Sequence, residues 1–135
     1  MTTVLCIDDN AVVLQLHKAL LEGKGYVVLT APDGATGIAI SRKRFVDAVV
    51  LDFNMAGVDG TEVVSVLMRE QPNLPVVISS GSVDEVPESL KWFSDALVQK
   101  GDGPEALLGA LERVLGFRTA AKRSPGKWLP QQENN

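Results

Sequence analysis

Acidic residues and one lysine follow apolar runs at three places in the sequence. Asp8 and Asp9 follow VLCI, Asp52 follows AVVL, and Lys100 follows ALVQ. If these runs are parallel strands, their carboxyl ends open onto one crevice, where three carboxylates repel each other unless a cation is bound. Carboxylate oxygens suit a hard cation such as Mg²⁺, and Lys100 adds positive charge. These residues therefore predict a site that holds a metal and a phosphate-like anion together.

Three more residues extend this chemistry. Asn54 can offer its backbone carbonyl to the metal and its amide to a phosphoryl group or an attacking water. Ser80 ends an apolar run with a hydroxyl that can hydrogen-bond a phosphoryl oxygen, and Gly81 leaves room above it. Beside a metal, Asp52 can act as a nucleophile and form an aspartyl phosphate, while the metal and Lys100 neutralise the phosphoryl oxygens. The pattern predicts phosphoryl transfer to a carboxylate.

The elements that position these residues alternate between short apolar runs and longer segments of helical period. This alternation is typical of repeated βα units with a parallel sheet. Five runs predict strands, at residues 3–7, 26–30, 46–51, 75–79 and 96–98. The alternation predicts an α/β fold, and right-handed connections between parallel strands predict helices on both faces of the sheet. The predicted fold is a doubly wound five-stranded parallel sheet of the flavodoxin-like type, with strand order 2-1-3-4-5.

Five segments predict helices that cover both faces of this sheet. They are residues 11–22, 34–44 and 60–70, a fourth that starts near Ser82 with a capping box, and a fifth that Asp102 caps. On the first helix, the apolar stripe predicted to face the sheet consists of Val12, Val13, Leu16, Ala19 and Leu20. The turns that open the second and third helices are predicted at Asp33 and Asp59.

Composition predicts one domain and excludes several classes of protein. The chain has 135 residues, of which 45% are hydrophobic, which is enough for one sizeable core. No run reaches the roughly 18 apolar residues of a membrane span, and the N-terminus has no basic leader. We therefore expect a cytoplasmic protein with no membrane partner. The single cysteine, Cys6, cannot form an internal disulfide and is interpreted as a core residue.

Charge divides the chain into two parts. Residues 1–116, the predicted domain, hold 9 Lys and Arg against 16 Asp and Glu, a net charge of −7 that argues against a nucleic-acid partner. Residues 117–135 hold 4 basic residues against 1 acidic residue and are rich in Pro, Gly, Gln and Asn. We expect this short basic segment to be a flexible tail, in which Trp128 is the one residue suited to docking.

The motifs together resemble the receiver domain of two-component response regulators. The resemblance rests on the acid pair after the first strand, LDFNMAGVDG around the third, LPVVISSG at the fourth and Lys100 after the fifth, and it covers residues 3–116. It implies a stand-alone receiver that takes a phosphoryl group from a histidine kinase or a histidine phosphotransfer protein. The phosphorylated domain then changes its binding to a downstream protein, which the sequence does not name. Such a switch assists its own phosphorylation and dephosphorylation but is not an enzyme with a separate substrate.

The resemblance also implies how the metal is held. In the family, Mg²⁺ is bound through the residues that match Asp9, Asp52 and the backbone carbonyl of Asn54, and Mn²⁺ is a possible substitute. The residue that matches Asp8 reaches the metal through water. The residue that matches Asp52 is also the one that is phosphorylated, so the resemblance assigns metal binding and phosphorylation to one site.

Lys100 and Ser80 match the lysine and hydroxyl that contact the phosphoryl group, but three nearby positions depart from the family pattern. Gly101 replaces a proline that often follows a cis peptide bond. Leu97 replaces an aromatic residue that turns inward on activation, and Ala56 replaces a common proline. The phosphorylation site is thus predicted to be intact, while the output switch is altered.

Two other functions stay open at this point. One is an interaction module that keeps the fold but is not regulated by phosphorylation, for which only Leu97 and Gly101 give support. The other is a phosphatase that forms an aspartyl phosphate, similar to the haloacid dehalogenase family. That family has a DxD pattern after its first strand, whereas Asp8 and Asp9 are adjacent, and 135 residues leave no room for a cap domain. We therefore disfavour the phosphatase.

Three further side chains have competing interpretations. His17, on the first predicted helix, is interpreted as a surface or half-buried packing residue, because a phosphotransfer histidine belongs to a four-helix scaffold that is absent here. Trp92 and Phe93 follow the fourth helix and either pack under it or form part of a partner surface.

Overall fold

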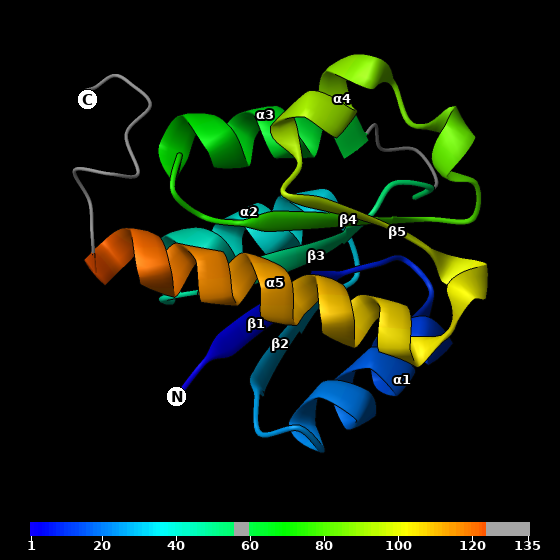
Figure 1. Cartoon of the computed structure of the whole chain (residues 1–135). Helices are drawn as coiled ribbons and strands as arrows, with labels where there is room; N and C mark the ends of the chain where they lie inside the picture. The colour runs from blue at the N-terminus through cyan, green and yellow to red at the C-terminus, as the bar shows by residue number, and fades with distance from the viewer. Residues whose placement is uncertain (56–59, 124–135) are drawn as a thin grey trace.

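The computed structural model describes residues 1–55 and 60–123 and contains one five-stranded sheet (Figure 1). All four strand pairings are parallel, in the order β2-β1-β3-β4-β5. The predicted fold class and strand order are confirmed. The strands are β1 (Thr3–Ile7), β2 (Val27–Ala31), β3 (Ala48–Asp52), β4 (Val76–Ser80) and β5 (Ala96–Gln99).

Helices cover both faces of this sheet. Figure 1 shows α1 and α5 on one face and α3 and α4 on the other, and α2 packs next to α3. Within the described ranges, no helix is both long enough and apolar enough to cross a membrane. The helices are α1 (Ala11–Glu22), α2 (Gly34–Lys43), α3 (Gly60–Glu70), α4 (Glu88–Phe93) and α5 (Pro104–Arg123).

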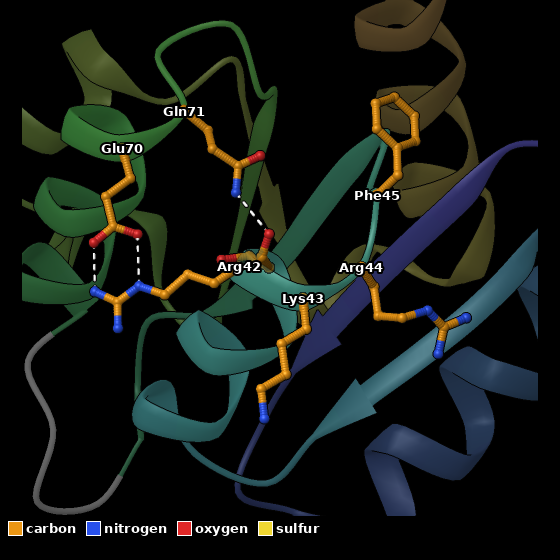
Figure 2. A pocket seen from close by; sticks show the side chains of 7 residues that line it. Arg42, Lys43, Arg44, Phe45, Glu70 and Gln71 are labelled. Atoms are coloured by element: carbon orange, nitrogen blue, oxygen red, sulfur yellow. Dashed lines mark hydrogen bonds and ion pairs between the residues drawn. The ribbon is translucent and has the colours of Figure 1, made fainter.

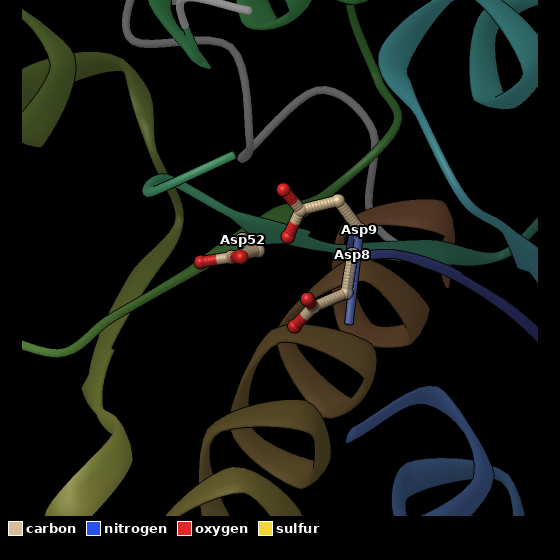
Figure 3. Close-up of side chains that lie close together, drawn as sticks. All are labelled: Asp8, Asp9 and Asp52. Carbon is tan, nitrogen blue, oxygen red and sulfur yellow. The ribbon is translucent and has the colours of Figure 1, made fainter. Parts of the chain in front are cut away.

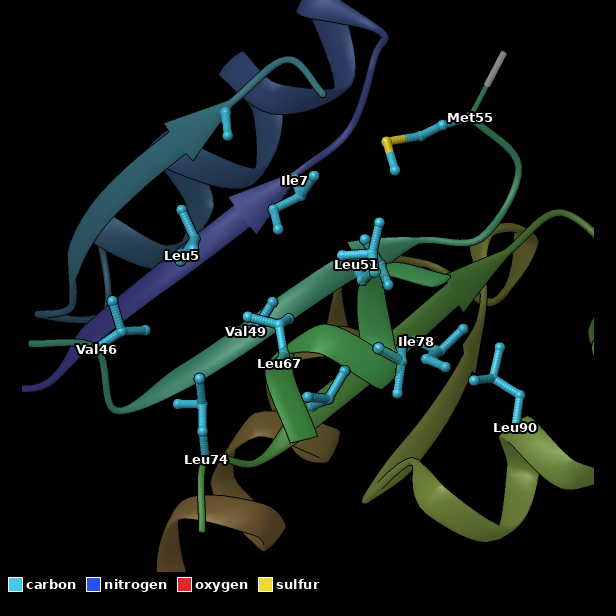
Figure 4. Close-up of a cluster of buried hydrophobic side chains, with 14 of the residues drawn as sticks. Leu5, Ile7, Val46, Val49, Leu51, Met55, Leu67, Leu74, Ile78 and Leu90 are labelled. Carbon is cyan, nitrogen blue, oxygen red and sulfur yellow. The ribbon is translucent and has the colours of Figure 1, made fainter. Parts of the chain in front are cut away.

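The strand side chains divide between two hydrophobic clusters, one on each face of the sheet. Successive side chains of a strand point to opposite faces. Leu5, Ile7 and Leu51 therefore lie in the cluster under α2, α3 and α4, which Figure 4 shows. Cys6 lies in the cluster under α1 and α5. Burial, with a smaller effect of the charge on Asp8, raises the pKa of the Cys6 thiol to about 12, so this thiol stays protonated as a core residue.

The first helix faces the sheet with a different side from the one predicted. Leu14 and Leu21 are buried, whereas Val12 is 67% exposed and Leu16 is 63% exposed. The predicted stripe is therefore wrong at Val12, Leu16 and Ala19, which are exposed, whereas Leu20 packs against the cluster under α1 and α5 as predicted. His17 lies three residues after Leu14 and four before Leu21, which puts it on the buried side of the helix. His17 is half-buried on this side, whereas Val12 and Leu16 lie at the surface.

The fourth helix starts later than predicted and also ends later, because Trp92 and Phe93, which were predicted to follow it, are its last two residues. Ser82 makes no capping hydrogen bond through its side chain and leads into a 3-10 turn (Val83–Glu85). α4 begins at Glu88, directly after Pro87. A proline has a fixed φ and no N–H, so it suits the start of a helix but not its interior. The capping box predicted at Ser82 is wrong for this reason.

The fifth helix is longer than predicted and begins at Pro104. Asp102 does not lie next to the helix, because it belongs to a 3-10 turn (Lys100–Asp102) and Gly103 follows it. Gly103 has a φ of +90°, a conformation that glycine adopts easily. Residues 117–123, expected in the tail, are helical.

The side-chain cap of α2 is confirmed. The Oδ1 atom of Asp33 accepts a hydrogen bond from the N–H of Thr36 at 2.7 Å. Asn10 caps α1 in the same way, which we did not predict. Three positions with predictions lie outside the described residues, namely Ala56, Asp59 and Trp128.

Gly37 allows α2 to approach β1 closely. A Cβ atom at this position would lie 2.3 Å from Cδ1 and 2.7 Å from Cγ1 of Ile7, a fully buried side chain. We expect Gly37→Ala to lower the free energy of unfolding by about 1–3 kcal/mol, because overpacking forces Ile7 or the helix to move. Urea unfolding measures this change.

Two further variants control for general effects of alanine in a helix. Ile7→Val removes Cδ1 and should restore part of the stability lost in Gly37→Ala. Gly109→Ala, on α5, adds a Cβ that meets only the end of the Arg113 side chain, at 4.0 Å, and should not destabilise the protein. Equal losses of stability at the two glycines would contradict the proposed clash.

Candidate functional site

The pairing of β1 with β3 brings three carboxylates together at the carboxyl edge of the sheet. Ile7 pairs with Leu51, so the residues that follow them, Asp8 and Asp52, lie at the ends of adjacent strands. Oxygen atoms of Asp8, Asp9 and Asp52 all lie within 4.8 Å of one another (Figure 3). Asp8 is 2% exposed and Asp52 is 3% exposed, whereas Asp9 is exposed. We call these three residues the acid cluster.

Lys100 contacts the acid cluster from the end of β5. Its Nζ atom lies 3.0 Å from Oδ1 of Asp52 and 3.5 Å from Oδ2 of Asp8. Burial acts to lower the pKa of Lys100, but the hydrogen bond to Asp52 and the negative charges of Asp52 and Asp8 outweigh it, so the pKa is raised. Lys100 is therefore a firmly charged cation that neutralises part of the acid cluster.

Asp8 has a raised pKa, and the main cause is burial of its carboxyl group. The negative charge of Asp52 also raises this pKa, whereas the N–H of Asn10, which donates to Oδ1 of Asp8 at 2.9 Å, and the charge of Lys100 lower it. The charged form of Asp8 thus lacks full compensation from the protein. Three close carboxylates with such a deficit of positive charge fit a hard divalent cation with oxygen ligands.

The end of β4, the strand next to β3, supplies hydrogen-bond donors. Ser80 is fully buried, and its hydroxyl lies 3.0 Å from Oδ1 of Asn54 and 2.8 Å from the carbonyl oxygen of Ser82. The N–H of Gly81 donates to the same Asn54 oxygen at 3.1 Å. A Cβ atom on Gly81 would meet nothing within 4 Å, so the space above this residue is open, as expected.

Asn54 is tied to the acid cluster as well as to β4. Its N–H donates to Oδ1 of Asp52 at 3.0 Å. All seven predicted site residues thus belong to one connected region, and the structure adds Ser82, whose backbone carbonyl has no signal in the sequence. The full set comprises Asp8, Asp9, Asp52, Asn54, Ser80, Gly81 and Lys100.

His17 is a neighbour of the site that the sequence did not indicate. Burial lowers its pKa, the positive charge of Lys100 lowers it further, and the charge of Asp52 opposes them. The neutral form of His17 is therefore favoured, and the residue is half-buried and within electrostatic range of the site. Half-buried packing, rather than phosphotransfer, is the environment that the structure gives it. If Leu14 and Leu21 had been predicted as the buried residues of α1, the position of His17 between them would have indicated its burial.

The positions that depart from the family pattern have plain structural settings. Leu97 is partly buried and packs against the hydrophobic cluster under α2, α3 and α4. Gly101 lies in the 3-10 turn that Lys100 begins, and the described residues contain no cis peptide bond. An aliphatic side chain at position 97 cannot present a hydroxyl or a ring to the surface.

A hollow of about 460 Å³ lies at the opposite end of the sheet, where α2 and α3 end (Figure 2). Its polar groups bind each other. Arg42 forms an ion pair with Glu70, and the amide of Gln71 donates to the carbonyl oxygen of Ser41 at 2.8 Å. None of the residues at the carboxyl ends of the strands lines it. Among the described residues, the acid cluster is therefore the candidate functional site.

A doubly wound sheet with its polar residues at the point where strand order reverses is the architecture of an α/β domain that binds a ligand or metal at that edge. The sequence matches the family model of the response regulator receiver domain over residues 4–112. The chain therefore belongs to the receiver domains of two-component response regulators. Members of this family are signalling switches and bind Mg²⁺ at an acidic pocket.

Individual relatives agree with this assignment. The chain is 37% identical over 115 residues to the probable transcriptional regulatory protein TcrX of Mycobacterium tuberculosis, with 84% of this chain and 49% of TcrX covered. The structure is similar to that of the chemotaxis response regulator CheY4 of Vibrio cholerae, with 32% identity, a TM-score of 0.74, and 85% and 99% of the two chains covered. A receiver domain protein of Clostridium thermocellum has a TM-score of 0.81 at 25% identity, with 89% and 98% covered. The chain spans from about a quarter to about half of the first curated relatives.

Asp8→Asn tests the electrostatic state of the acid cluster. The variant keeps an oxygen for the N–H of Asn10 but removes a buried charge. A pKa raised by folding means that the neutral form is favoured in the folded protein, so the wild-type protein loses stability as pH rises through the pKa of Asp8. At neutral pH without metal, we expect the variant to unfold roughly 3–6 °C higher than the wild type, the effect of about 1 kcal/mol.

Differential scanning calorimetry with and without Mg²⁺ measures both parts of this expectation. Mg²⁺ should raise the unfolding temperature of the wild type and have little effect on Asp8→Asn, because ligand binding stabilises only a state that has the site. Asp84→Asn removes an exposed carboxylate and serves as the control, with no change in either condition. A lower unfolding temperature for metal-free Asp8→Asn would contradict the assigned cost of the buried charge.

Proposed function

We propose that this domain is a phosphorylation-dependent switch in which Asp52 accepts a phosphoryl group from a phosphohistidine donor. The observation that carries the proposal is the environment of Asp52. Its carboxylate is buried, lies 3.0 Å from the ammonium of Lys100 and belongs to the acid cluster with Asp8 and Asp9. A carboxylate with a fixed cation and metal-binding oxygens beside it suits attack on phosphorus.

Four residues would hold the metal in this proposal. Asp8, Asp9, Asp52 and the backbone carbonyl of Asn54 all offer oxygen atoms, the ligands that Mg²⁺ and Mn²⁺ prefer. When bound, the metal supplies positive charge against the phosphoryl oxygens. Lys100 supplies further positive charge from the end of β5.

The chain's own residues perform the transfer by positioning. Asp52 forms a bond to phosphorus while the bond between phosphorus and the donor imidazole breaks. The hydroxyl of Ser80 and the N–H of Gly81 are donors for a phosphoryl oxygen, and the open space above Gly81 admits the group. The domain thus assists its own phosphorylation, without a separate substrate.

Exposed apolar side chains on two helices support protein partners for this switch. Val12 and Leu16 lie one helical turn apart at the start of α1, which follows the acid pair, and suit docking of a histidine kinase or histidine phosphotransfer protein. Trp92 on α4 is 86% exposed and does not pack under its helix, so it suits contact with a downstream protein.

A single experiment separates this function from an interaction module and a phosphatase. Incubation with acetyl phosphate and Mg²⁺ should add one phosphoryl group to the wild-type protein, detected by intact mass, and none to Asp52→Asn, because an amide is a poor nucleophile. Asp84→Asn should be phosphorylated like the wild type. No adduct on the wild type would favour an interaction module, whereas rapid turnover of unrelated phosphate esters would favour a phosphatase.

Lys100→Ala tests the role of the cation. The variant keeps every proposed metal ligand, so isothermal titration should still detect Mg²⁺ binding. The initial rate of phosphorylation by acetyl phosphate should fall roughly 100-fold, because a fixed donor to the phosphoryl oxygens is lost. Lys91→Ala removes a surface lysine that pairs with Glu88 and should leave the rate unchanged. A normal rate in Lys100→Ala would exclude the assigned role.

A further inference from the structure

The side chain of Asn54 faces the two groups that would receive a phosphoryl oxygen. Its Oδ1 atom lies 3.0 Å from the hydroxyl oxygen of Ser80 and accepts the N–H of Gly81 at 3.1 Å. A backbone N–H can only donate, so the amide atom that faces Gly81 is the oxygen and not the nitrogen. Two donors from the end of β4 therefore converge on one oxygen atom of the loop that follows β3.

This oxygen has the chemistry of the group that the site is proposed to bind. A phosphoryl oxygen is also an acceptor, and a charged one, so it would compete for both donors. The N–H of Asn54 is bonded to Oδ1 of Asp52 at 3.0 Å, which means that the competing amide and the proposed phosphorylation site belong to one short loop. Asp52 also pairs with Ser79, which precedes Ser80, so both acceptors belong to residues beside the end of β4.

We infer that Oδ1 of Asn54 occupies the place of a phosphoryl oxygen in the resting protein and has to leave it when Asp52 is phosphorylated. Asn54 is then a positioning residue, an internal latch that holds Ser80 and Gly81 until the phosphoryl group replaces it. The inference rests on the proposed function of Asp52 and adds a mode of regulation to it.

The hydrogen bonds around Ser80 permit such an exchange. Its single hydroxyl proton is shared between the Asn54 oxygen at 3.0 Å and the Ser82 carbonyl at 2.8 Å, and the N–H of Ser82 points to the hydroxyl oxygen at 3.2 Å. The hydroxyl of this fully buried serine keeps a partner when the amide leaves. A buried donor is costly to leave unpaired. Because the Ser80 hydroxyl can bond to the Ser82 carbonyl while the Asn54 amide leaves, the exchange avoids this cost.

The amide can also leave without penalty. Asn54 is exposed, so its side chain can rotate into water and find new partners there. The latched form is therefore only moderately favoured. The apparent rate of phosphorylation should be reduced by the fraction of molecules that are latched, as for any site that is competent only part of the time.

This inference differs in sign from the role first expected for Asn54. If its amide assisted the phosphoryl group or an attacking water, its removal would slow phosphorylation. If it is a latch, Asn54→Ala should be phosphorylated about three to ten times faster by acetyl phosphate and Mg²⁺, because the competitor is gone while the backbone carbonyl remains.

Hydrogen exchange of the Gly81 amide, measured by NMR in the metal-free and unphosphorylated protein, gives an independent readout. In Asn54→Ala this amide loses its acceptor and should exchange at least about threefold faster than in the wild type. Asn54→Asp keeps an acceptor oxygen, so Gly81 should stay protected and phosphorylation should be no faster than in the wild type. Asn73→Ala removes an exposed asparagine near the other end of β4 and should change neither measurement.

The outcomes separate the latch from the proposed function. If neither the wild type nor Asn54→Ala is phosphorylated, the proposed function fails. The proposed competition between the Asn54 amide and a phosphoryl oxygen then fails too, whatever the exchange rate of the Gly81 amide. If the wild type is phosphorylated at Asp52 but Asn54→Ala is equally fast or slower, the latch alone is overturned. Faster exchange at Gly81 without faster phosphorylation would likewise leave Asn54 with a structural role only.

Discussion

The closeness of two buried carboxylates governs this domain. Parallel pairing of β1 with β3 puts Asp8 and Asp52 side by side at the edge of strands that are otherwise apolar. Burying like charges costs free energy, and for this reason burial and the charge of Asp52 raise the pKa of Asp8. The ammonium of Lys100 lies near both carboxylates and reduces their repulsion. Since a divalent cation would take the same oxygens, the partners of Lys100 have to change when the site is loaded.

The site has two chemically distinct halves that one residue connects. The ends of β1 and β3 gather negative charge, and the end of β4 gathers hydrogen-bond donors. Asn54 binds the first half through its N–H to Asp52 and the second half through its side-chain oxygen to Ser80 and Gly81. A change at Asp52 can thus reach the loop after β4 through hydrogen bonds alone. Leu97, which has no polar atom in its side chain, gives that loop no aromatic partner on β5.

The fold and the convergence of the site could be predicted because both follow from local pattern. Alternating apolar and helical segments imply a parallel sheet, and a parallel sheet brings the ends of its strands together. The sequence could not show which side of α1 faces the sheet, because apolar residues lie on more than one side of this helix and only packing selects Leu14 and Leu21. It could not show the direction of the Asn54 amide either, because that depends on a contact between residues 26 positions apart. Pattern predicts which residues meet, but not the rotamers in which they meet.

The tight contact between Gly37 and Ile7 links the outer layer of the domain to its chemistry. Ile7 is the last residue of β1 and directly precedes Asp8, so the strand end that carries a proposed metal ligand also supports α2. Any residue larger than glycine at position 37 would press on this strand end from the opposite side. The size of an apolar residue on α2 can therefore shift the position of Asp8, with no polar contact to the acid cluster.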